Sequence, residues 1–264
     1  MHTGVTRQVF FEMLDILTKE FNKIHKNGHF KGIGPGCKLV IALTYWREYR
    51  AMRQMGLDYD VALSTVSDSV RWVEDILFNA GFCIQDIKTE LKNLEEENVK
   101  VECIIGDVEE QRIERPTINQ EDNYSGKKKD HTEKNQILID EKSEKILNYY
   151  CSKGTVHDYQ MLKNSDVLPF LEERKISGKF DSGYQGVQKE LTNAVIPFKK
   201  SKNHELTEEE KEHNKKLSKE RIKVEHVNRK IKIFRIAKER YRNHQNRYEL
   251  RMNIMCSIYN RNIG

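Results

Sequence analysis

The spacing of apolar residues changes near residue 98 of this 264-residue chain, and this change limits the possible folds more than any other feature. Before it, apolar residues recur every three or four positions, which is the repeat of an amphipathic helix. After it, short apolar runs alternate with helical segments. We therefore predict an α+β chain in two parts, with an all-α region over residues 1–97 and an α/β sandwich with a mixed sheet over residues 98–264.

The helical part contains the pattern of a helix-turn-helix at about residues 30–80. A first helix, over residues 6–25, has an apolar stripe that we expect to be buried, made of Phe10, Leu14, Leu17, Phe21 and Ile24. A second follows from residue 37, and a short third, over about residues 50–55, ends at Gly56. The fourth begins after an expected N-cap at Ser64 and places Val66, Val70, Val73 and Leu77 on one face.

The start of this fourth helix has the residue types that read DNA bases in the major groove. We expect four side chains to contact DNA there: Ser64, Thr65, Ser67 and Arg71. An ordinary helical bundle fits the same pattern and is the commoner explanation of it, because Ser and Thr near a helix start usually serve as caps.

The second part begins with a strand whose alternation turns fully apolar at Cys103–Ile105 and ends at Asp107. A charged connector helix over residues 86–98 precedes it and turns Ile87, Leu91 and Leu94 inward. A capping box, Thr207 to Glu210, opens a long helix that runs to about residue 236. Between them we expect, in order, strands at 136–139 and 145–150, a helix at 157–171, a strand at 176–180 ending at Asp181, a helix near Gln185 and a strand at 194–196.

Three acidic residues have positions that suggest a metal site. Asp107 and Asp181 each follow an apolar strand, and Glu225 lies on the long helix between Val224 and Val227. Strand ends open onto the crevice where α/β sheets bind ligands, and converging carboxylates are the oxygen ligands that Mg²⁺ prefers. Two simpler roles stay open: Asp181 can belong to a turn, and Glu225 can pair along the helix with Arg221 or Arg229.

Charge and cysteine usage narrow the class of protein. Residues 199–251 hold 18 Lys and Arg against 9 Asp and Glu, a net charge of +9 in a chain whose total is +5, which suggests a polyanionic partner or else a solvated helical surface. The five cysteines are scattered without metal or disulfide spacing, as in reduced proteins. No signal peptide or membrane-spanning run is found, so we expect a cytoplasmic protein.

Several blocks make the chain resemble a known family, the DDE transposases of bacterial insertion sequences, in the insertion-sequence-five group, with a Harbinger-like DDE endonuclease domain. The two most specific blocks are D-S-G-Y-Q-G at 181–186 and V-E-H-V-N-R at 224–229. The other matching blocks are at 44–50, 63–74, 104–107, 113–116, 124–129 and 154–158.

The resemblance implies an RNase H-like, retroviral-integrase-type catalytic domain. It assigns Asp107, Asp181 and Glu225 as the catalytic residues and the ligands of Mg²⁺, with two ions and with Mn²⁺ as a substitute. The implied reaction is cleavage of double-stranded DNA at the terminal inverted repeats of the element and strand transfer into a target site, by a homo-oligomer assembled on the DNA.

Further residues are expected near the DNA or the metal. Phosphate contacts are expected from Lys127, Lys128, Lys129, Arg229, Lys232 and Arg235. Tyr241 and Tyr248 are available for stacking, and His157 and Asp158 lie beside the metal ligands, although a helix N-cap is the simpler role for Asp158.

One departure from the family pattern supports an alternative function. The first acidic motif of the family reads D-x-T-E, and here Glu109 occupies the Thr position. The chain also begins close to its first matching block, which suggests a truncated copy. The alternative is therefore a catalytically inactive or truncated copy that acts only as a DNA-binding protein. A stand-alone RNase H-type nuclease fits less well, because it leaves the helix-turn-helix without a role.

Overall fold

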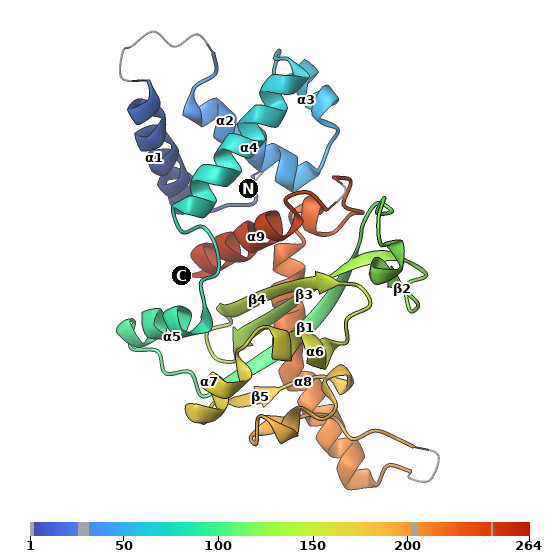
Figure 1. Cartoon of the computed structure of the whole chain (residues 1–264). Helices are drawn as coiled ribbons and strands as arrows, with labels where there is room; N and C mark the ends of the chain where they lie inside the picture. The colour runs from blue at the N-terminus through green and yellow to red at the C-terminus, as the bar shows by residue number, and fades with distance from the viewer. Residues whose placement is uncertain (1–2, 26–31, 202–204, 244) are drawn as a thin grey trace. The chain divides into compact units, whose positions relative to one another are not determined.

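The computed structural model describes residues 3–25, 32–201, 205–243 and 245–264, which form two compact units (Figure 1). The first unit combines Met1–Cys83 with Ile231–Gly264, and the second is Ile84–Lys230. This division differs from the predicted boundary at residue 97 in two places, because the connector helix belongs to the second unit and the C-terminal segment to the first. None of the helices in the described ranges has the length and apolarity that a bilayer-spanning segment requires.

The first unit is all-α. Its elements are α1 (Arg7–Ile24), α2 (Pro35–Glu48), α3 (Met52–Asp58), α4 (Leu63–Asn79), the 3-10 turn η4 (Arg235–Ala237) and α9 (Tyr248–Ile263). All four residues predicted for the buried face of α4 are inaccessible to solvent: Val66, Val70, Val73 and Leu77. The helix begins two residues earlier than expected, and its N-cap is Ala62. The prediction of Ser64 as the cap was therefore wrong.

Two other local predictions in this unit were also wrong. Helix α1 carries two adjacent apolar lines, and it buries Val9, Met13 and Leu17, while Ile24 of the predicted stripe is 59% exposed. Gly56 lies inside α3 and does not end it. A Cβ atom at Gly56 would stand 2.7 Å from the Val61 carbonyl oxygen, so the close approach of the following turn requires glycine there.

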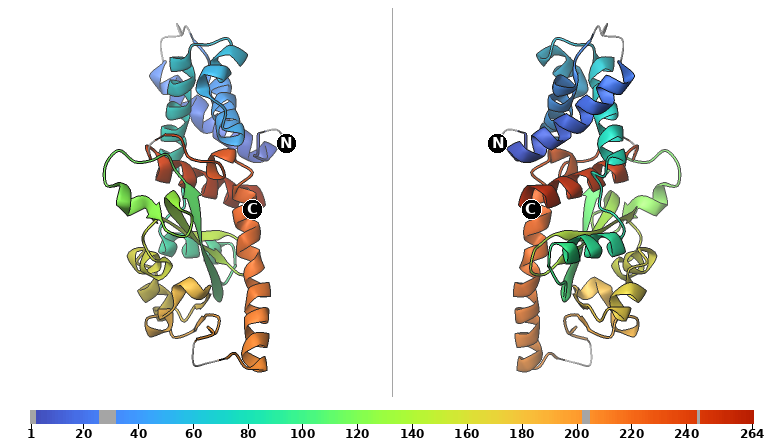
Figure 2. Two further views of the ribbon diagram at one scale, coloured as in Figure 1. Left: turned by 90° about the vertical axis from the view of Figure 1, so that its right-hand side faces the viewer. Right: turned by 90° about the vertical axis from the view of Figure 1, so that its left-hand side faces the viewer.

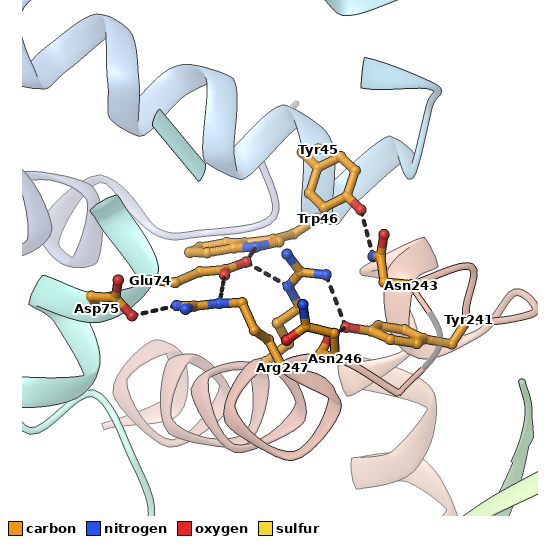
Figure 3. A network of polar contacts seen from close by, with 9 residues as sticks. Tyr45, Trp46, Glu74, Asp75, Tyr241, Asn243, Asn246 and Arg247 are labelled. Carbon is orange, nitrogen blue, oxygen red and sulfur yellow. Dashed lines mark hydrogen bonds and ion pairs between the residues drawn. The ribbon is translucent and has the colours of Figure 1, made fainter. Parts of the chain in front are cut away.

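The C-terminal segment packs against α2 and α4 through a buried charged cluster centred on Glu74 of α4 (Figure 3). The Glu74 carboxylate is inaccessible and accepts hydrogen bonds from Trp46 Nε1 at 3.1 Å and from the Nε atoms of Arg247 and Arg251 at 2.6 Å. Arg251 Nη1 also donates to the Tyr241 hydroxyl at 2.8 Å. A carboxylate is stable in the interior only with such partners, so the C-terminal segment is part of the core of this unit.

The second unit is a mixed sheet with helices on both faces (Figure 2). Strands β2, β3, β1, β5 and β6 are neighbours in that order, and β4 pairs with β3; β3 is antiparallel to β1, whereas β5 and β6 run parallel to it. The strands are β1 (Cys103–Arg112), β2 (Tyr124–Ser125), β3 (Asp130–Asp140), β4 (Ile146–Lys153), β5 (Ser177–Lys179) and β6 (Ala194–Val195). This mixed sheet agrees with the predicted RNase H-like class.

Helix α8 (Glu208–Ile231) covers one face of the sheet, and α6 (Asp158–Asn164) and α7 (Leu168–Glu173) lie on the other (Figure 2). On the face of the sheet that carries α6 and α7, the apolar core also includes residues of α5 (Ile87–Glu96). The buried residues of α5 are the three predicted, Ile87, Leu91 and Leu94. The capping box at the start of α8 is confirmed, since Thr207 N donates to Glu210 Oε2 at 2.9 Å and Glu210 N donates to Thr207 Oγ1 at 3.2 Å.

Two predicted elements of this unit differ from the structure. The single helix expected over residues 157–171 is two helices, because Asp166 adopts a left-handed backbone conformation (φ 54°) and Pro169 lies in the first turn of the second helix. The helix expected near Gln185 is a pair of 3-10 turns, η2 (Ser182–Tyr184) and η3 (Val187–Lys189), separated by Gly186 at φ 95°.

Candidate active site

The sequence predicted Asp107 at the end of its strand, but the structure places it in the middle of β1. The strand continues to Arg112 because the residues after Asp107 keep pairing with β3, as far as Thr132. The Asp107 carboxylate faces α8, where Oδ1 accepts from Arg221 Nη2 and Oδ2 from Asn228 Nδ2, both at 3.0 Å. Both oxygens of this half-buried carboxylate are therefore hydrogen-bonded.

Asp181 follows β5, the parallel neighbour of β1. The register pairs Ile105 with Lys179, and continuing it by two residues brings Asp181 beside Asp107 on the same face of the sheet. Asp181 also caps the η2 turn, since its Oδ1 accepts from Gly183 N at 2.8 Å. The turn role that the sequence left open is therefore present, and it fixes the direction of this side chain.

Glu225 lies on α8, the helix that covers this face. Its neighbours Val224 and Val227 are fully buried, whereas Glu225 itself is exposed. Of its two expected helical partners, Arg221 pairs with Asp107. The exposed Glu225 carboxylate therefore lies one helical turn from the Arg221–Asp107 ion pair.

The environment of Asp107 changes its protonation. Its pKa is raised to about 7, chiefly by burial; the charge of Arg221 opposes this rise, and the charges of Glu109, Asp181 and Glu225 add to it. Among the described residues, no three Asp, Glu, His or Cys side chains are placed so that they could hold a metal ion together. Glu109, Asp181 and Glu225 are the acidic residues whose charges act on the pKa of Asp107.

Sequence reasoning missed three contacts around this region. It considered Arg221 only as a partner of Glu225 and gave Asn228 no role, although Asn228 lies in the V-E-H-V-N-R block. It also overlooked Lys134 of β3, which is 9% exposed and donates to Asp158 Oδ1 at 2.9 Å and to the Val156 carbonyl at 2.7 Å. A lysine inside an otherwise half-apolar strand was the available signal.

Comparison with known proteins identifies the family of the chain. The family model described as "DDE superfamily endonuclease" matches residues 107–260, and the model described as "Helix-turn-helix of DDE superfamily endonuclease" matches residues 34–82. A curated relative from Microchaete diplosiphon, named "Probable transposase for insertion sequence element IS702", is 38% identical over 259 residues, which are 98% of this chain and 91% of the relative.

The chain belongs to the DDE transposases of insertion sequences. No solved structure gives a significant match. Membership in the family identifies the process as DNA transposition and the region at residues 34–82 as a DNA-binding helix-turn-helix. The match begins at Asp107, the first of the three acids.

The residues expected to read DNA bases lie at the start of α4, within the matched helix-turn-helix. Ser64 and Arg71 are exposed, and Thr65 and Ser67 are partly exposed. Ser64 is free of the capping role that the sequence suggested for it, because the N-cap is Ala62. Their contact with DNA stays a prediction.

The basic residues expected at phosphates are on the surface. Lys127, Lys128 and Lys129 are exposed in the turn between β2 and β3. Arg229 is exposed on α8 in the second unit, and Lys232 and Arg235 belong to the first unit.

Tyr241 and Tyr248 are not available for stacking on DNA. They are 0% and 3% exposed, because Tyr241 stacks on Tyr49 and packs edge-on against Tyr248 in the core of the first unit. That prediction was wrong.

Asp158 lies beside Gly183, the residue whose N–H binds Asp181, and it is not the N-cap that the sequence suggested. His157 is the N-cap of α6 without a side-chain hydrogen bond, and Asp158 is the first helical residue. The Asp158 carboxylate pairs with Lys134 and approaches Gly183 so closely that a Cβ atom there would be 2.4 Å from Asp158 Oδ2. Asp158 therefore supports the turn that Asp181 caps.

Proposed function

We propose that this protein cuts DNA at the ends of its element and joins the freed 3′-hydroxyl to target DNA, with divalent metal ions held by Asp107, Asp181 and Glu225. The observation that carries the proposal is the placement of the three carboxylates: Asp107 lies on β1, Asp181 follows its parallel neighbour β5, and Glu225 lies on α8 one turn from the arginine that pairs with Asp107. A bound cation would relieve the repulsion among neighbouring carboxylates.

The donor set fits Mg²⁺, and Mn²⁺ as its substitute. All three side chains offer carboxylate oxygens, which suit hard divalent cations. When bound, two such ions activate the attacking oxygen and stabilise the leaving oxygen of an in-line phosphoryl transfer. Arg221 and Asn228 hold the Asp107 carboxylate in one orientation through its two oxygens. Asp181 is held by Gly183, so two of the three proposed ligands are oriented before any cation binds.

In this proposal the DNA substrate is bound by the surrounding basic and polar residues. Lys127, Lys128, Lys129, Arg229, Lys232 and Arg235 contact the phosphates of double-stranded DNA, and Ser64, Thr65, Ser67 and Arg71 read the terminal repeat. The protein acts as a homo-oligomer assembled on DNA, so that the two ends of one element are cut together.

The test replaces Glu225 with glutamine, which keeps the size and helix propensity of the side chain and removes its charge. We expect Glu225→Gln to melt within about 0.5 kcal/mol of wild type, to bind element-end DNA and to lose Mg²⁺-dependent nicking. Circular dichroism, gel shifts and nicking of a labelled element end measure the three properties.

The matched control is Glu212→Gln, since Glu212 is an exposed glutamate near the start of the same helix. Glu220 is less suitable because it pairs with Lys179 at 3.0 Å. The control should nick normally. A Glu225→Gln protein that nicks as fast as wild type would overturn the assignment of the three ligands.

A further inference from the structure

An open pocket lies beside the turn that holds Asp181. Its volume is about 600 Å³, and Gly183, Gln185, Thr155 and residues of α6 line it. Gly183 is the residue whose N–H donates to Asp181 Oδ1. The pocket and the proposed metal ligand Asp181 therefore both contact Gly183.

Residues of β3 and α6 hold the Gly183 wall of this pocket in place. Lys134 fixes Asp158 at 2.9 Å, and Asp158 packs against Gly183. Gly186, at the other end of the turn, is at φ 95° and faces the ring of Tyr159. The pocket is thus a formed feature of the fold whose shape depends on a buried ion pair.

The chemistry of the lining favours a neutral planar group over a phosphate. Lys163 is the one lysine in the described lining, and it is paired with Glu190 at 2.7 Å. The Tyr159 hydroxyl donates to the same carboxylate at 2.8 Å, and the Lys163 ammonium lies 4.6 Å from the centre of the tyrosine ring. A phosphate would need positive charge that Glu190 already neutralises.

The lining also contains two carboxamides, Gln160 on α6 and Gln185 after η2, together with Val156 and the imidazole of His157. Gln160 Nε2 donates to Asn164 Oδ1 at 2.7 Å, which leaves its carbonyl oxygen to accept from a ligand. Carboxamides pair with the edges of nucleobases, and tyrosine rings pack against them. The combination of amide groups, an aromatic ring and little net charge matches a base.

We propose that this pocket takes an unpaired base of the DNA strand that is cut, from the nucleotide that adjoins the phosphate at Asp181. The inference rests on the proposed function, because that function places the scissile phosphate at Asp181. Removal of this base from the helix holds the strand in register at the site of cleavage, and the Gln160 and Gln185 amides determine which base fits.

The experiment places 2-aminopurine at each position on either side of the cleavage site in duplex element-end DNA. The full-length protein is added in EDTA, so that no strand is cut. We expect a several-fold rise of fluorescence at one position, where the base leaves the stack, and no rise with the Gln160→Ala, Gln185→Ala double variant. Gln188→Ala, at an exposed glutamine three residues beyond Gln185, is the matched control and should give the wild-type signal.

A second measurement separates recognition from folding. The double variant should nick intact DNA about tenfold more slowly, as expected for the loss of base contacts, but should nick DNA that is abasic at the responding position as fast as wild type does. Fluorescence that stays low at every position, or an equal loss on intact and abasic DNA, overturns the pocket assignment. Wild-type protein that fails to nick in Mg²⁺ overturns the proposed function instead, whatever the fluorescence shows.

Discussion

Opposing electrostatic effects act on Asp107. Burial and the neighbouring charges of Glu109, Asp181 and Glu225 favour its neutral form, whereas Arg221 favours its charged form. Burial and the charges of the three acids outweigh the effect of Arg221, so the folded protein holds a proton on Asp107 more tightly than the unfolded chain does. The bond from Asn228 and the ion pair with Arg221 fix the orientation of the carboxylate without removing this penalty.

The raised pKa predicts how stability depends on pH in the absence of metal. Asp107 titrates near 3.8 when unfolded and near 7 when folded, so between these values the unfolded chain releases a proton that the folded protein keeps. The contribution of Asp107 is fully present below pH 4, and the free energy of unfolding falls by about 1.4 kcal/mol per pH unit as the pH rises toward 7. The Asp107→Asn variant should lack this decline. Urea unfolding at pH 4.5, 5.5 and 6.5 in EDTA measures the difference between the two proteins.

The control for this prediction is Glu173→Gln, at an exposed glutamate on the surface of the same unit. It should keep the wild-type dependence on pH. If wild type and Asp107→Asn lose stability in parallel over this range, the carboxylate of Asp107 is already ionised in the folded protein.

At this scale the sequence located the three acids but not their partners. Order along the chain and resemblance to the family were enough to single out Asp107, Asp181 and Glu225. The contacts of Asp107 with Arg221 and Asn228 span more than 100 positions, and no local pattern reports such a pairing. The pocket beside Gly183 was equally invisible, since it depends on how two loops and a helix pack.

At the scale of elements, periodicity succeeded where one face of a helix is buried and the other is not. Helix α4 is of this kind, and its four buried apolar residues were predicted one by one, whereas the buried Ser69 and Glu74 were not. Helix α9 was missed because it is buried almost all round, including Arg251 and Ser257, so it shows no polar face. The length of β1 was underestimated because the polar residues after Asp107 still alternate and still pair with β3.

Helix α4 makes a prediction about DNA recognition. Arg71 is exposed on the side opposite the buried valines, within the first three turns of the helix. If it makes a two-point contact with a guanine, Arg71→Ala should lose about 1–3 kcal/mol of preference for element-end over scrambled DNA. Lys19→Ala, at an exposed lysine on α1, should change the affinity for both DNAs equally. Competition gel shifts at fixed salt measure the preference, and an unchanged preference in Arg71→Ala would exclude Arg71 from base reading.

At the scale of the whole molecule, the chain passes between its two units twice, after Cys83 and after Lys230. The sequence suggested a simpler order, with the helical region in front and everything after residue 97 in the catalytic domain. Hydrophobic spacing reports the type of each element but not which distant element covers it. The contacts of the returning C-terminal segment include a buried carboxylate, Glu74, and two arginines more than 170 positions away from it.

This return determines which fragment of the protein can bind DNA. A fragment of residues 1–97 would lack Arg247 and Arg251 and leave Glu74 buried without its cationic partners, which destabilises a domain by about 3–5 kcal/mol. It would also expose the apolar faces that α9 covers. We expect this fragment to be unfolded by circular dichroism and not to shift element-end DNA.

Residues 1–83 joined through a glycine–serine linker to residues 231–264 should melt cooperatively and bind element-end DNA. Glu74→Gln with Arg251→Met, introduced together into the linked protein, tests the cause, because removing both members of a buried ion pair is far less disruptive than removing one. The double variant should therefore be more stable than Arg251→Met alone. A fragment of residues 1–97 that folds and binds as well as the linked protein would show that the C-terminal segment is dispensable for the reader.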